Sequence, residues 1–473
     1  MIDTEAIRKR ILDIAIAGQL GLNNPNESAP TLPDVDESID ERDKIFSIPS
    51  NWRWAKIGWI MSIERGGSPR PIKSYLTDSD DGINWIKIGD VEKGGKYILK
   101  TKEKIKPEGE KKSRRVYPGD FLLTNSMSFG RPYISKIQGC VHDGWLILRN
   151  INGLFYYDFL YHLLSSSYMY AQFTKKATGS TVDNLNIDKV ADAVIPVPPI
   201  DEQKRIVERI ELLFNNVDII DILQQQYANN ITSLNKSILD LAVMGKLVPQ
   251  DPNDEPASVL LKKIAEEKQK LIKEGKIKKQ KALPEITEDE IPFDIPETWA
   301  WVQLDELAIF ENGDRGKNYP NKSEYVQSGV AWINTGHIQP SGYLTTTEMN
   351  YITREKFESL RSGKIEENDL VFCLRGATYG KVSRVEPYTE GAVASSLMII
   401  RPIISILRDY LFLYLKTPLA FSELAKYANG SAQPNLGAKD VRKYLVPLPP
   451  LKEQKRILEC VEEILPKLDD LRK

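Results

Sequence analysis

The sequence predicts an α+β protein in which two tandem copies of one mixed α/β domain are separated by an antiparallel two-helix coiled coil, in a circular pseudo-twofold organisation. The first observation behind this prediction is an internal duplication. The matching segments pair residues 48–54 with 295–301, residues 82–86 with 329–333 and residues 194–206 with 445–457. The displacement is 247 positions for the first two pairs (48 to 295) and 251 for the third (206 to 457). So long a period indicates a duplicated domain rather than a solenoid repeat.

The N-terminus closes this duplication into a circle. Residues 11–20 (ILDIAIAGQL) match residues 238–247 (ILDLAVMGKL), which is a displacement of 227 (11 to 238). The last residue, Lys473, is therefore equivalent to position 222 (473 − 251), and Met1 is equivalent to position 228 (1 + 227). We expect the C-terminal helix to end about where the N-terminal helix begins.

A heptad pattern is the second main observation. After Pro199, apolar residues recur at steps of four and three, which is typical of a coiled-coil seam. The expected seam positions are Ile206, Ile210, Leu213, Val217, Ile220, Gln224, Tyr227, Ile231, Leu234, Ile238 and Leu241. Pro198 and Pro199 prevent an earlier start, while Gly245 and Pro249 mark the end of the helix.

The partner helix should be assembled from both ends of the chain. Its apolar positions are Ile457, Val461, Ile464, Leu468 and Leu471 from the C-terminus, continued by Ile7, Ile11 and Ile14 from the N-terminus. It should lie antiparallel to the central helix, because each helix leaves one copy of the domain and reaches the other. Gln224, the one polar residue of the central seam, either fixes the register or lies beside the gap between the chain ends. The second interpretation is favoured.

These patterns set the domain boundaries. We expect an N-terminal helix over 1–22 that completes the distal coiled-coil helix, a first domain over 45–198, a central helix over 199–250, a charged helical connector over 251–292, a second domain over 293–449 and a C-terminal helix over 450–473. Short alternating strands, such as 120–124 and 369–373, are expected in the domains, followed by helices over 157–173 and 409–427.

Composition excludes several classes of protein. With 41% hydrophobic and 27% charged residues the chain is typical of soluble globular proteins, and no apolar run reaches the length of a membrane span. Three widely spaced cysteines favour a reducing cytoplasm without a disulfide scaffold or a zinc site. The net charge of −2 does not by itself favour nucleic acid. A basic stretch over 96–115 is either a phosphate contact or a solvated loop.

The residues of a catalytic site are missing from the sequence. There is no GxGxxG and no GxxxxGK[ST] motif, and the three histidines have no metal-ligand spacing. The two Pro-Pro pairs lack the flanking Asn or Asp and the aromatic residue with which an adenine-methylating enzyme grips its base. Glu-Gln-Lys at 202–204 and 453–455 resembles part of a nuclease motif, but a place in the first turn of a helix explains it better. We therefore predict that the chain is not an enzyme and binds no metal and no cofactor.

Four loops occupy matching places in the two copies while their side chains differ. This is how one scaffold would recognise two different DNA sequences, since Arg and Lys pair with guanine, Asn and Gln with adenine, and Ser and Thr suit phosphate. The candidate DNA-binding residues of the first copy are Arg65, Ser68, Arg70, Lys73, Lys87, Asn125, Ser126, Arg131, Thr181 and Asn184. Those of the second copy are Arg315, Lys317, Asn334, Arg375, Tyr379, Lys381, Gln433 and Asn435. The alternative is that the loops are ordinary surface turns.

The whole chain resembles the specificity subunit of type I restriction–modification systems. The resemblance rests on the two variable domains, the two Pro-Pro-x-x-Glu-Gln-Lys segments and the segment 245–256 (GKLVPQDPNDEP). It implies a non-catalytic subunit with two target-recognition domains, each recognising one half of a split double-stranded DNA site. It also implies two methyltransferase subunits that use S-adenosylmethionine to methylate adenine, and two motor/nuclease subunits that can join them and use ATP with Mg²⁺.

Two other interpretations remain open from the sequence. The chain could be a structural adaptor whose coiled coil assembles proteins and whose two domains bind peptides. It could also belong to a methylation-only or altered defence system. The sequence does not give the DNA target, because the identity of a side chain without its docking geometry does not fix the identity of a base.

Overall fold

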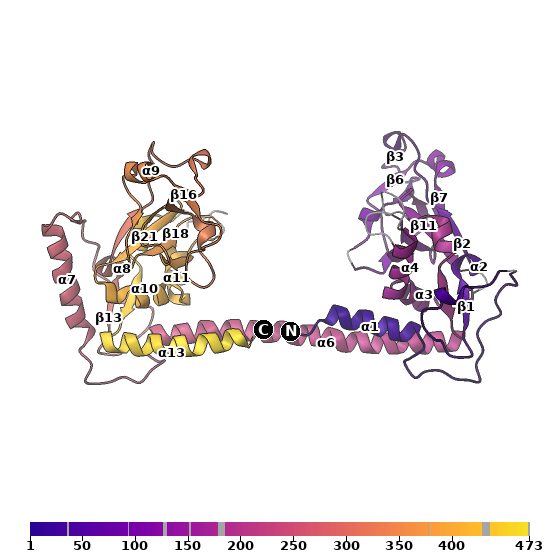
Figure 1. Ribbon diagram of the computed structural model, residues 1–473, viewed down its shortest axis with the longest axis horizontal. Helices are drawn as coiled ribbons and strands as arrows, with labels where there is room; N and C mark the ends of the chain where they lie inside the picture. The colour runs from indigo at the N-terminus through magenta and orange to yellow at the C-terminus, as the bar shows by residue number, and fades with distance from the viewer. Residues whose placement is uncertain are drawn as a thin grey trace. The chain divides into compact units, whose positions relative to one another are not determined.

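The computed structural model describes residues 1–473 except 36, 93, 126–129, 151–152, 178–184, 377, 428–435 and 472–473. It divides into two compact units, Met1–Gln225 and Gln226–Lys473, and helix α6 (Ile200–Val243) begins in the first unit and ends in the second (Figure 1). No helix in the described part of the chain is long and apolar enough to cross a membrane. Each unit contains one copy of the duplicated domain.

The first domain contains three sheets. One sheet has the order β2 (Met61–Arg65), β11 (Trp145–Asn150), β8 (Phe121–Thr124), β9 (Pro132–Ser135) and β5 (Tyr97–Ile98). The next has the order β3 (Leu76–Thr77), β6 (Glu103–Ile105), β4 (Ile83–Ile86), β10 (Gly139–Val141) and β7 (Arg114–Val116). The third pairs β1 (Arg53–Lys56) with β12 (Val194–Val197). The α-helices of the unit that precede α6 are α1 (Thr4–Ile16), α2 (Ile57–Ile60), α3 (Tyr157–Leu164), α4 (Ser167–Ala177) and α5 (Ile187–Ala191).

The second domain repeats this topology with fewer strands. Its sheets have the orders β14 (Ala308–Asn312), β21 (Leu397–Pro402), β18 (Leu370–Cys373), β19 (Val382–Arg384), and β16 (Asn350–Ile352), β15 (Val330–Ile333), β20 (Gly391–Val393), β17 (Lys364–Ile365). A third sheet pairs β13 (Ala300–Gln303) with β22 (Leu445–Leu448). The α-helices of the second unit that follow α6 are α7 (Ala257–Lys273), α8 (Leu304–Leu307), α9 (Arg354–Ser359), α10 (Arg408–Leu415), α11 (Pro418–Tyr427), α12 (Ala438–Val441) and α13 (Leu451–Asp470). The equivalent strand orders confirm the predicted duplication and the mixed α/β fold of the copies.

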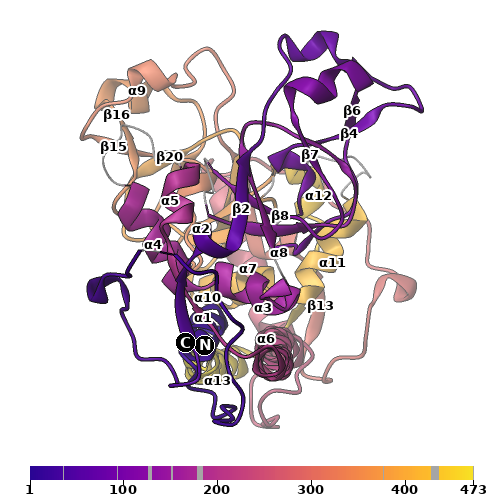
Figure 2. The ribbon, with the colours of Figure 1, turned by 90° about the vertical axis from the view of Figure 1, so that its right-hand side faces the viewer.

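In each domain the strand at the centre of one sheet is buried on both faces. Phe121 and Leu123 of β8 pack in the cluster that contains α3, whereas Leu122 packs against Ile86 and Val141 of the other sheet. This alternation follows from the two-residue period of a strand. The layers therefore run from α1 and α6 through α3 and α4 to the two sheets, and the sheet with β4 and β6 lies farthest from α1 and α6 (Figure 2).

The helices expected over 157–173 and 409–427 are each interrupted once. In the first domain α3 and α4 are separated at Ser166, whose hydroxyl accepts a hydrogen bond from the Met169 N–H at 3.2 Å. In the second domain Thr417 caps α11 in the same way, accepting from the Ala420 N–H at 3.2 Å. A Ser or Thr cap ends one helix and starts the next, which the sequence prediction of a single helix missed.

The repeated Pro-Pro-x-x-Glu-Gln-Lys-Arg segment attaches a long helix to each domain. Gln203 accepts from the Tyr156 N–H at 2.8 Å and donates to the carbonyl oxygens of Leu154 and Pro198. In the second unit the buried Glu453 accepts from the Trp299 indole N–H at 2.9 Å. These residues lie in the first turn of a helix, as the sequence predicted, and their side chains bond to the adjoining domain.

The N-terminal segment and the middle of the chain occupy equivalent places in their own units. Gly18 has a φ of +70°, and a Cβ atom there would lie 2.6 Å from the Pro49 ring. Gly245 has a φ of +69°, and a Cβ atom there would lie 2.5 Å from the Pro296 ring. Ion pairs repeat as well, since Arg205 binds Glu27 at 2.8 Å and Arg456 binds Asp254 at 2.7 Å. These contacts support the circular arrangement.

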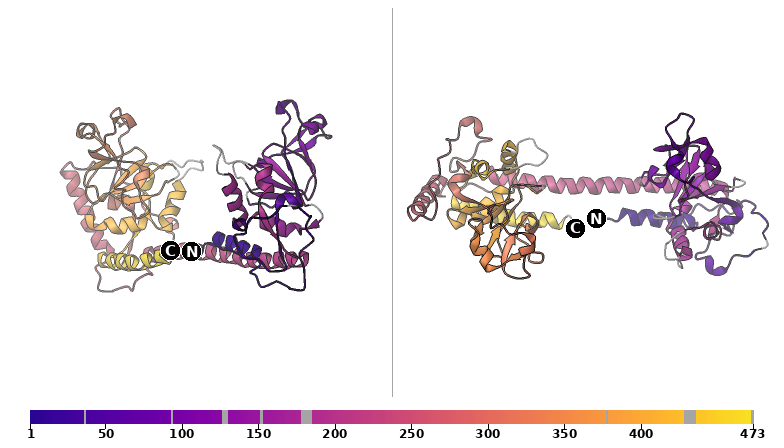
Figure 3. Two further views of the ribbon diagram at one scale, coloured as in Figure 1. Left: turned by 45° about the vertical axis from the view of Figure 1, so that its right-hand side comes forward. Right: turned by 90° about the horizontal axis from the view of Figure 1, so that it is seen from above.

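Each half of α6 packs against one chain end (Figure 3). In the first unit Gln224 bonds to the backbone of Ile2, accepting from its N–H at 2.6 Å, and Arg8 of α1 pairs with Asp218 at 2.6 Å. In the second unit Ile231 and Ile238 pack in one cluster with apolar residues of α13, namely Ile457, Val461, Ile464 and Leu468. Gln224 therefore lies beside the first residues of the chain.

The predicted seam is correct along one row of α6 and only in the first half of the other row, where Ile206 is buried and Leu213 and Ile220 are half-buried. In the first row Ile210, Val217, Ile231 and Ile238 are buried, and Gln224 is half-buried. Tyr227, Leu234 and Leu241, which the heptad pattern also placed in the seam, are 46%, 46% and 38% exposed. A straight helix has 3.6 residues per turn and drifts by about 20° per heptad from a 3.5-residue repeat. The buried face of α6 therefore shifts toward Ala242 near the end of the helix, and the row that contains Tyr227, Leu234 and Leu241 turns outward.

Burial of His162 predicts a pH-dependent stability of the first unit. His162 packs against Phe214 of α6, and its Nε2 atom has no hydrogen-bond partner within the described ranges. Burial, and then the charge of Lys96, lowers the pKa of His162 from 6.5 to about 4. Because the folded state keeps the ring neutral while the unfolded state gains a proton, stability is present above pH 6.5 and is lost as the pH falls toward 4. The loss should be about 2–3 kcal/mol.

The matched variant is His162→Leu, because the equivalent residue of the second domain is the buried Leu413. Urea unfolding of the full chain at pH 7 and pH 4.5, followed by hydrogen exchange in peptides of α3, should show a smaller pH effect in this variant. The same pH effect in both proteins would contradict the assignment to His162.

Candidate nucleic-acid interface

In each domain several strands end at one place, which we call the strand-end junction. In the first domain β2 and β8 both pair antiparallel with β11, so both end where β11 begins. Strands β4 and β10 are parallel and end beside them. The first junction therefore joins the loops that follow β2, β4 and β8 to the short turn 142–144 between β10 and β11.

Backbone hydrogen bonds hold the loops of the first junction to this turn. The N–H groups of Gly66 and Asn125 donate to the carbonyl oxygens of Trp145 and Gly144 at 2.9 and 3.0 Å. The His142 N–H donates to the Ile86 carbonyl at 3.4 Å. Gly66 is required here, because a Cβ atom at this position would lie 2.1 Å from the His142 carbonyl oxygen.

The second junction has the same construction. The N–H groups of Gly313 and Leu374 donate to the carbonyl oxygens of Leu397 and Ser396 at 3.3 and 2.9 Å, and the Ala394 N–H donates to Ile333 at 2.7 Å. A Cβ atom at Gly313 would lie 2.4 Å from the Ala394 carbonyl oxygen. One backbone framework thus presents two different sets of side chains.

The residues that directly follow the fourth predicted loop, which spans 178–184 in the first domain and 429–435 in the second, also reach the junction. The Leu185 N–H donates to the Asn125 carbonyl at 2.9 Å, and the Leu436 N–H donates to the Leu374 carbonyl at 3.2 Å. The candidates Ser126, Thr181, Asn184, Gln433 and Asn435 lie outside the described residues. In each domain, described residues in or beside the four predicted loops nevertheless meet at one place.

The side chains of the first junction surround an open cleft of about 730 Å³. Three of the predicted residues line it, namely Ser68, Arg70 and Lys87. Trp85, His142 and Asp143 line it as well, and the sequence prediction did not include them. The Ser68 hydroxyl donates to Asp143 Oδ1 at 2.5 Å, Arg70 Nη2 lies 3.5 Å from Asp143 Oδ2, and Lys87 pairs with Glu103 at 2.7 Å.

The other candidates of the first domain divide into exposed and internal groups. Lys73 and Arg131 are exposed. The Arg65 Nε–H donates to the Asp143 carbonyl at 3.5 Å. Asn125 corrects the prediction, because only 2% of its surface is exposed and its amide donates to the Asp143 carbonyl at 2.7 Å. Its side chain positions the turn 142–144 instead of facing a ligand.

Cations gather in the second junction. Arg315 and Arg375 line a hollow of about 440 Å³ together with Lys426, Lys439 and Asp440. Burial, and then the charge of Arg315, lowers the pKa of the Arg375 guanidinium. Arg315 donates to the Ser395 carbonyl at 3.4 Å, and Lys426 pairs with Glu423. Within the described part of the chain neither arginine is paired with a carboxylate, so the hollow suits an anion or the acceptor edge of guanine.

The remaining candidates of the second domain differ in exposure. Lys317 and Lys381 are exposed, whereas Tyr379 is half-buried against the core. Asn334 caps the 3₁₀ turn η8 (Thr335–His337), because its side chain accepts a hydrogen bond from the Gly336 N–H at 2.9 Å. Lys426 and Lys439 were missed because they belong to α11 and α12, which the sequence does not place beside the arginine loops.

In the basic stretch 96–115 some residues are held in ion pairs and others are exposed. Lys96 pairs with Asp158, and Arg115 pairs with Glu110 at 2.6 Å, while Lys100, Lys106 and Lys111 are exposed. Only part of this stretch is therefore free to contact phosphate.

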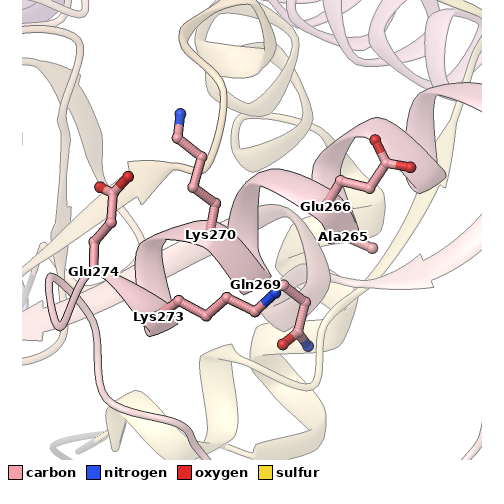
Figure 4. Close-up of a pocket in the computed structure, with 6 residues that line it drawn as sticks. All are labelled: Ala265, Glu266, Gln269, Lys270, Lys273 and Glu274. Atoms are coloured by element: carbon pink, nitrogen blue, oxygen red, sulfur yellow. The ribbon is translucent and has the colours of Figure 1, made fainter.

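Two further features of the described residues differ from the junctions. Among the residues outside the masked gaps no group of three or more His, Cys, Asp or Glu side chains could hold a metal ion. A hollow along α7 is lined only by residues of that helix and by its C-cap Glu274, and the labelled Lys270 and Glu274 side chains project from the helix (Figure 4). It brings together no residues from different segments, so it carries no chemistry comparable to that of the junctions.

Comparison with known proteins agrees with this construction. The chain matches the family described as the type I restriction modification DNA specificity domain over residues 49–228 and again over 296–471. It is 27% identical to the EcoAI specificity subunit of Escherichia coli, over 97% of this chain and 88% of that protein. It is 26% identical to the EcoEI specificity subunit of Escherichia coli, over 98% of this chain and 90% of that protein.

Solved structures agree in fold. The HsdS subunit from Thermoanaerobacter tengcongensis has a TM-score of 0.51 at 18% identity, covering 91% of this chain and 94% of that one. A chain from a structure on the complex assembly and conformational transition of the type I R-M system has a TM-score of 0.58 at 18% identity, covering 90% and 93%. Because the family match covers most of the chain and both copies of its domain, the chain belongs to the DNA specificity subunits of type I restriction–modification systems.

Proposed function

We propose that this chain recognises a split double-stranded DNA site and directs adenine methylation at it by partner subunits. The domains 45–198 and 293–449 each contact one half-site through their strand-end junctions. The observation that carries this proposal is the construction of one loop framework twice with different side chains, Asp143 and Ser68 in one copy and Arg315 and Arg375 in the other. Recognition of two unlike half-sites needs a common scaffold with different hydrogen-bonding groups.

Charge supports DNA as the ligand of the second junction. Two neighbouring guanidinium groups repel one another, and the partial burial of Arg375 strengthens this repulsion. A bound phosphate or a guanine edge would relieve it, since both accept bidentate hydrogen bonds from arginine. A peptide-binding adaptor, the other candidate class, gives no comparable reason for two arginines without carboxylate partners.

The partners in this proposal are two methyltransferase subunits, which hold S-adenosylmethionine, while the chain itself is non-catalytic. Two motor/nuclease subunits that use ATP and Mg²⁺ join when the system also cleaves DNA. An apolar row on α6 is the proposed methyltransferase contact. Its members are Leu212 (54% exposed), Ile219 (53%), Leu223 (56%), Tyr227 (46%), Leu234 (46%) and Leu241 (38%), each four or seven residues from the next. A row of this length on a soluble helix marks a protein contact.

The direct test is to map methylated adenines in the DNA of cells that express this chain with its methyltransferase subunits. The proposal predicts one bipartite sequence with an unspecified spacer. Methylation that is absent, or that depends on a single continuous sequence, would contradict it. Specific, salt-dependent DNA binding by the complex would also exclude the adaptor function.

Single arginine substitutions should affect the two half-sites separately. Arg375→Ala should weaken recognition of one half-site by about 1–3 kcal/mol, and Arg131→Ala should weaken the other, because each removes one contact from one domain. Binding of the complex to duplexes with one altered half-site measures the effect. Arg42→Ala is the control, since Arg42 is an exposed arginine in the 3₁₀ turn η1 (Glu41–Asp43), outside both junctions. An equal loss at every sequence would indicate phosphate contacts.

A charge placed on the apolar row of α6 should weaken assembly. Leu234→Asp should reduce methyltransferase binding by on the order of tenfold or more, because the charge would lose its hydration in an apolar contact. Ser233→Asp adds the same charge on the neighbouring exposed position and should have little effect. Size-exclusion chromatography of the mixed subunits distinguishes these outcomes, and unchanged assembly with Leu234→Asp would exclude the row as the contact.

The helices should set the spacer between the half-sites. Inserting seven residues into α6 after Gln225, with a matching seven-residue extension of α13, adds about 10 Å of helix. The mapped spacer should lengthen by roughly three base pairs while both half-site sequences stay the same. An unchanged spacer would show that the helices do not measure the separation.

A further inference from the structure

Asp143 is a negatively charged group at the centre of the first junction. It lies in the turn between β10 and β11, where the loops after β2, β4 and β8 meet, and 47% of its side chain is exposed in the cleft. The residue at the equivalent position of the second junction is Ser395, which is neutral. A carboxylate at a surface that meets phosphates lowers DNA affinity unless it gains a specific partner.

Neighbouring groups fix the position and the charge of this carboxylate. Ser68 donates to Oδ1 at 2.5 Å, and Arg70 Nη2 lies 3.5 Å from Oδ2. The backbone carbonyl of Asp143 accepts from the Asn125 amide at 2.7 Å and from Arg65 Nε at 3.5 Å. The hydrogen bond from Ser68 is the main reason that the pKa of Asp143 is lowered. The group is thus ionised and held by residues of two loops.

The chemistry of a carboxylate restricts what it can contact on DNA. An ionised carboxylate only accepts hydrogen bonds, and its two oxygens offer about four acceptor sites, of which Ser68 uses one. Phosphate oxygens and the base acceptors are therefore excluded as partners. The donors that the major groove presents are the exocyclic amines, N4 of cytosine and N6 of adenine.

We propose that Asp143 accepts a hydrogen bond from the exocyclic amine of a cytosine or adenine in the half-site that the first domain recognises. The proposal rests on the proposed DNA-recognition function and adds to it the chemical group that one side chain recognises. It also explains why Ser68 and Asn125, from two different loops, both bond to Asp143. A base contact needs an acceptor that is held in place before the DNA arrives.

The test uses the complex of the full chain with its methyltransferase subunits and duplexes that carry the mapped site. Each adenine of the first half-site is replaced in turn by purine, which lacks the N6 amine, and each cytosine by 2-pyrimidinone, which lacks the N4 amine. The same analogues placed in the spacer control for weakened base pairing. Binding is measured for the native chain, for Asp143→Ser and for the control Asp80→Asn, an exposed aspartate in the turn before β4. Asp143→Ser introduces the residue type that the second junction already accommodates.

We expect one analogue position to weaken binding by about tenfold or more with the native chain and with Asp80→Asn. With Asp143→Ser the same analogue should cost little further, because the contact is already absent. The position at which this happens distinguishes cytosine from adenine. Recognition of the second half-site should be unchanged, which also shows that the variant is folded.

If every analogue costs the same with the native chain and with Asp143→Ser, the carboxylate makes no base contact and only orients Ser68 and Arg70, and the inference is wrong. Asp143→Asn gives a second measure, since it keeps one acceptor oxygen without the charge and should retain part of the effect. If the native complex recognises no bipartite site at all, the proposed function itself fails. The two failures are therefore distinguishable.

Discussion

The proposed recognition surface of each domain depends on one short turn whose backbone accepts hydrogen bonds from the loops around it. In the first domain the carbonyl groups of Asp143, Gly144 and Trp145 hold the loops that follow β2 and β8. In the second domain the carbonyl groups of Ser395, Ser396 and Leu397 do the same. The bonds to Gly144, Trp145, Ser396 and Leu397 come from backbone N–H groups, so most side chains at the junction can change without loss of these bonds. Glycine is the exception at 66 and 313, where the backbone of the turn leaves no room for a Cβ atom.

This division between framework and side chain connects the fold to the function. The framework needs the two sheets to pack face to face, which buries β8 and β18 on both sides and fixes where their loops emerge. The two junctions then differ in chemistry, with an ionised carboxylate in one and, in the other, two arginines that pair with no carboxylate among the described residues. Unlike groups on like frameworks are what recognition of two unlike DNA sequences requires. The long helices supply the second requirement, a connection on which the proposed methyltransferase contact lies.

Much of the fold could be predicted because the sequence contains two copies of one domain, which can be compared with each other. Segments that match between the copies showed the framework, and segments that differ showed the loops. The register of α6 could not be predicted as well, because the sequence repeats every 3.5 residues whereas the helix turns every 3.6, and Leu234 is exposed as a result. The single helices expected over 157–173 and 409–427 are divided at Ser166 and Thr417, because a hydroxyl side chain can cap a helix as well as continue it.

The candidate sites show where sequence reasoning stops. The sequence predicted Asn125 as a base-binding residue. Its side chain is buried, which a single sequence does not show, and its amide donates to the Asp143 carbonyl in the turn. Asp143 was missed although the Asp-Gly pair at 143–144 is a turn signal, because the equivalent Ser395-Ser396 pair shares no feature with it. Lys426 and Lys439 come from helices that reach the second junction only through tertiary packing.

The most direct measurement of the central claim is hydrogen–deuterium exchange of the assembled complex with and without its mapped DNA site. The account predicts protection on DNA binding in the turns 142–144 and 394–396 and in the loops after β2, β8, β14 and β18, in both domains together. A duplex with one scrambled half-site should remove the protection from one domain only. Protection confined to the long helices, or to one domain with the full site, would contradict the account.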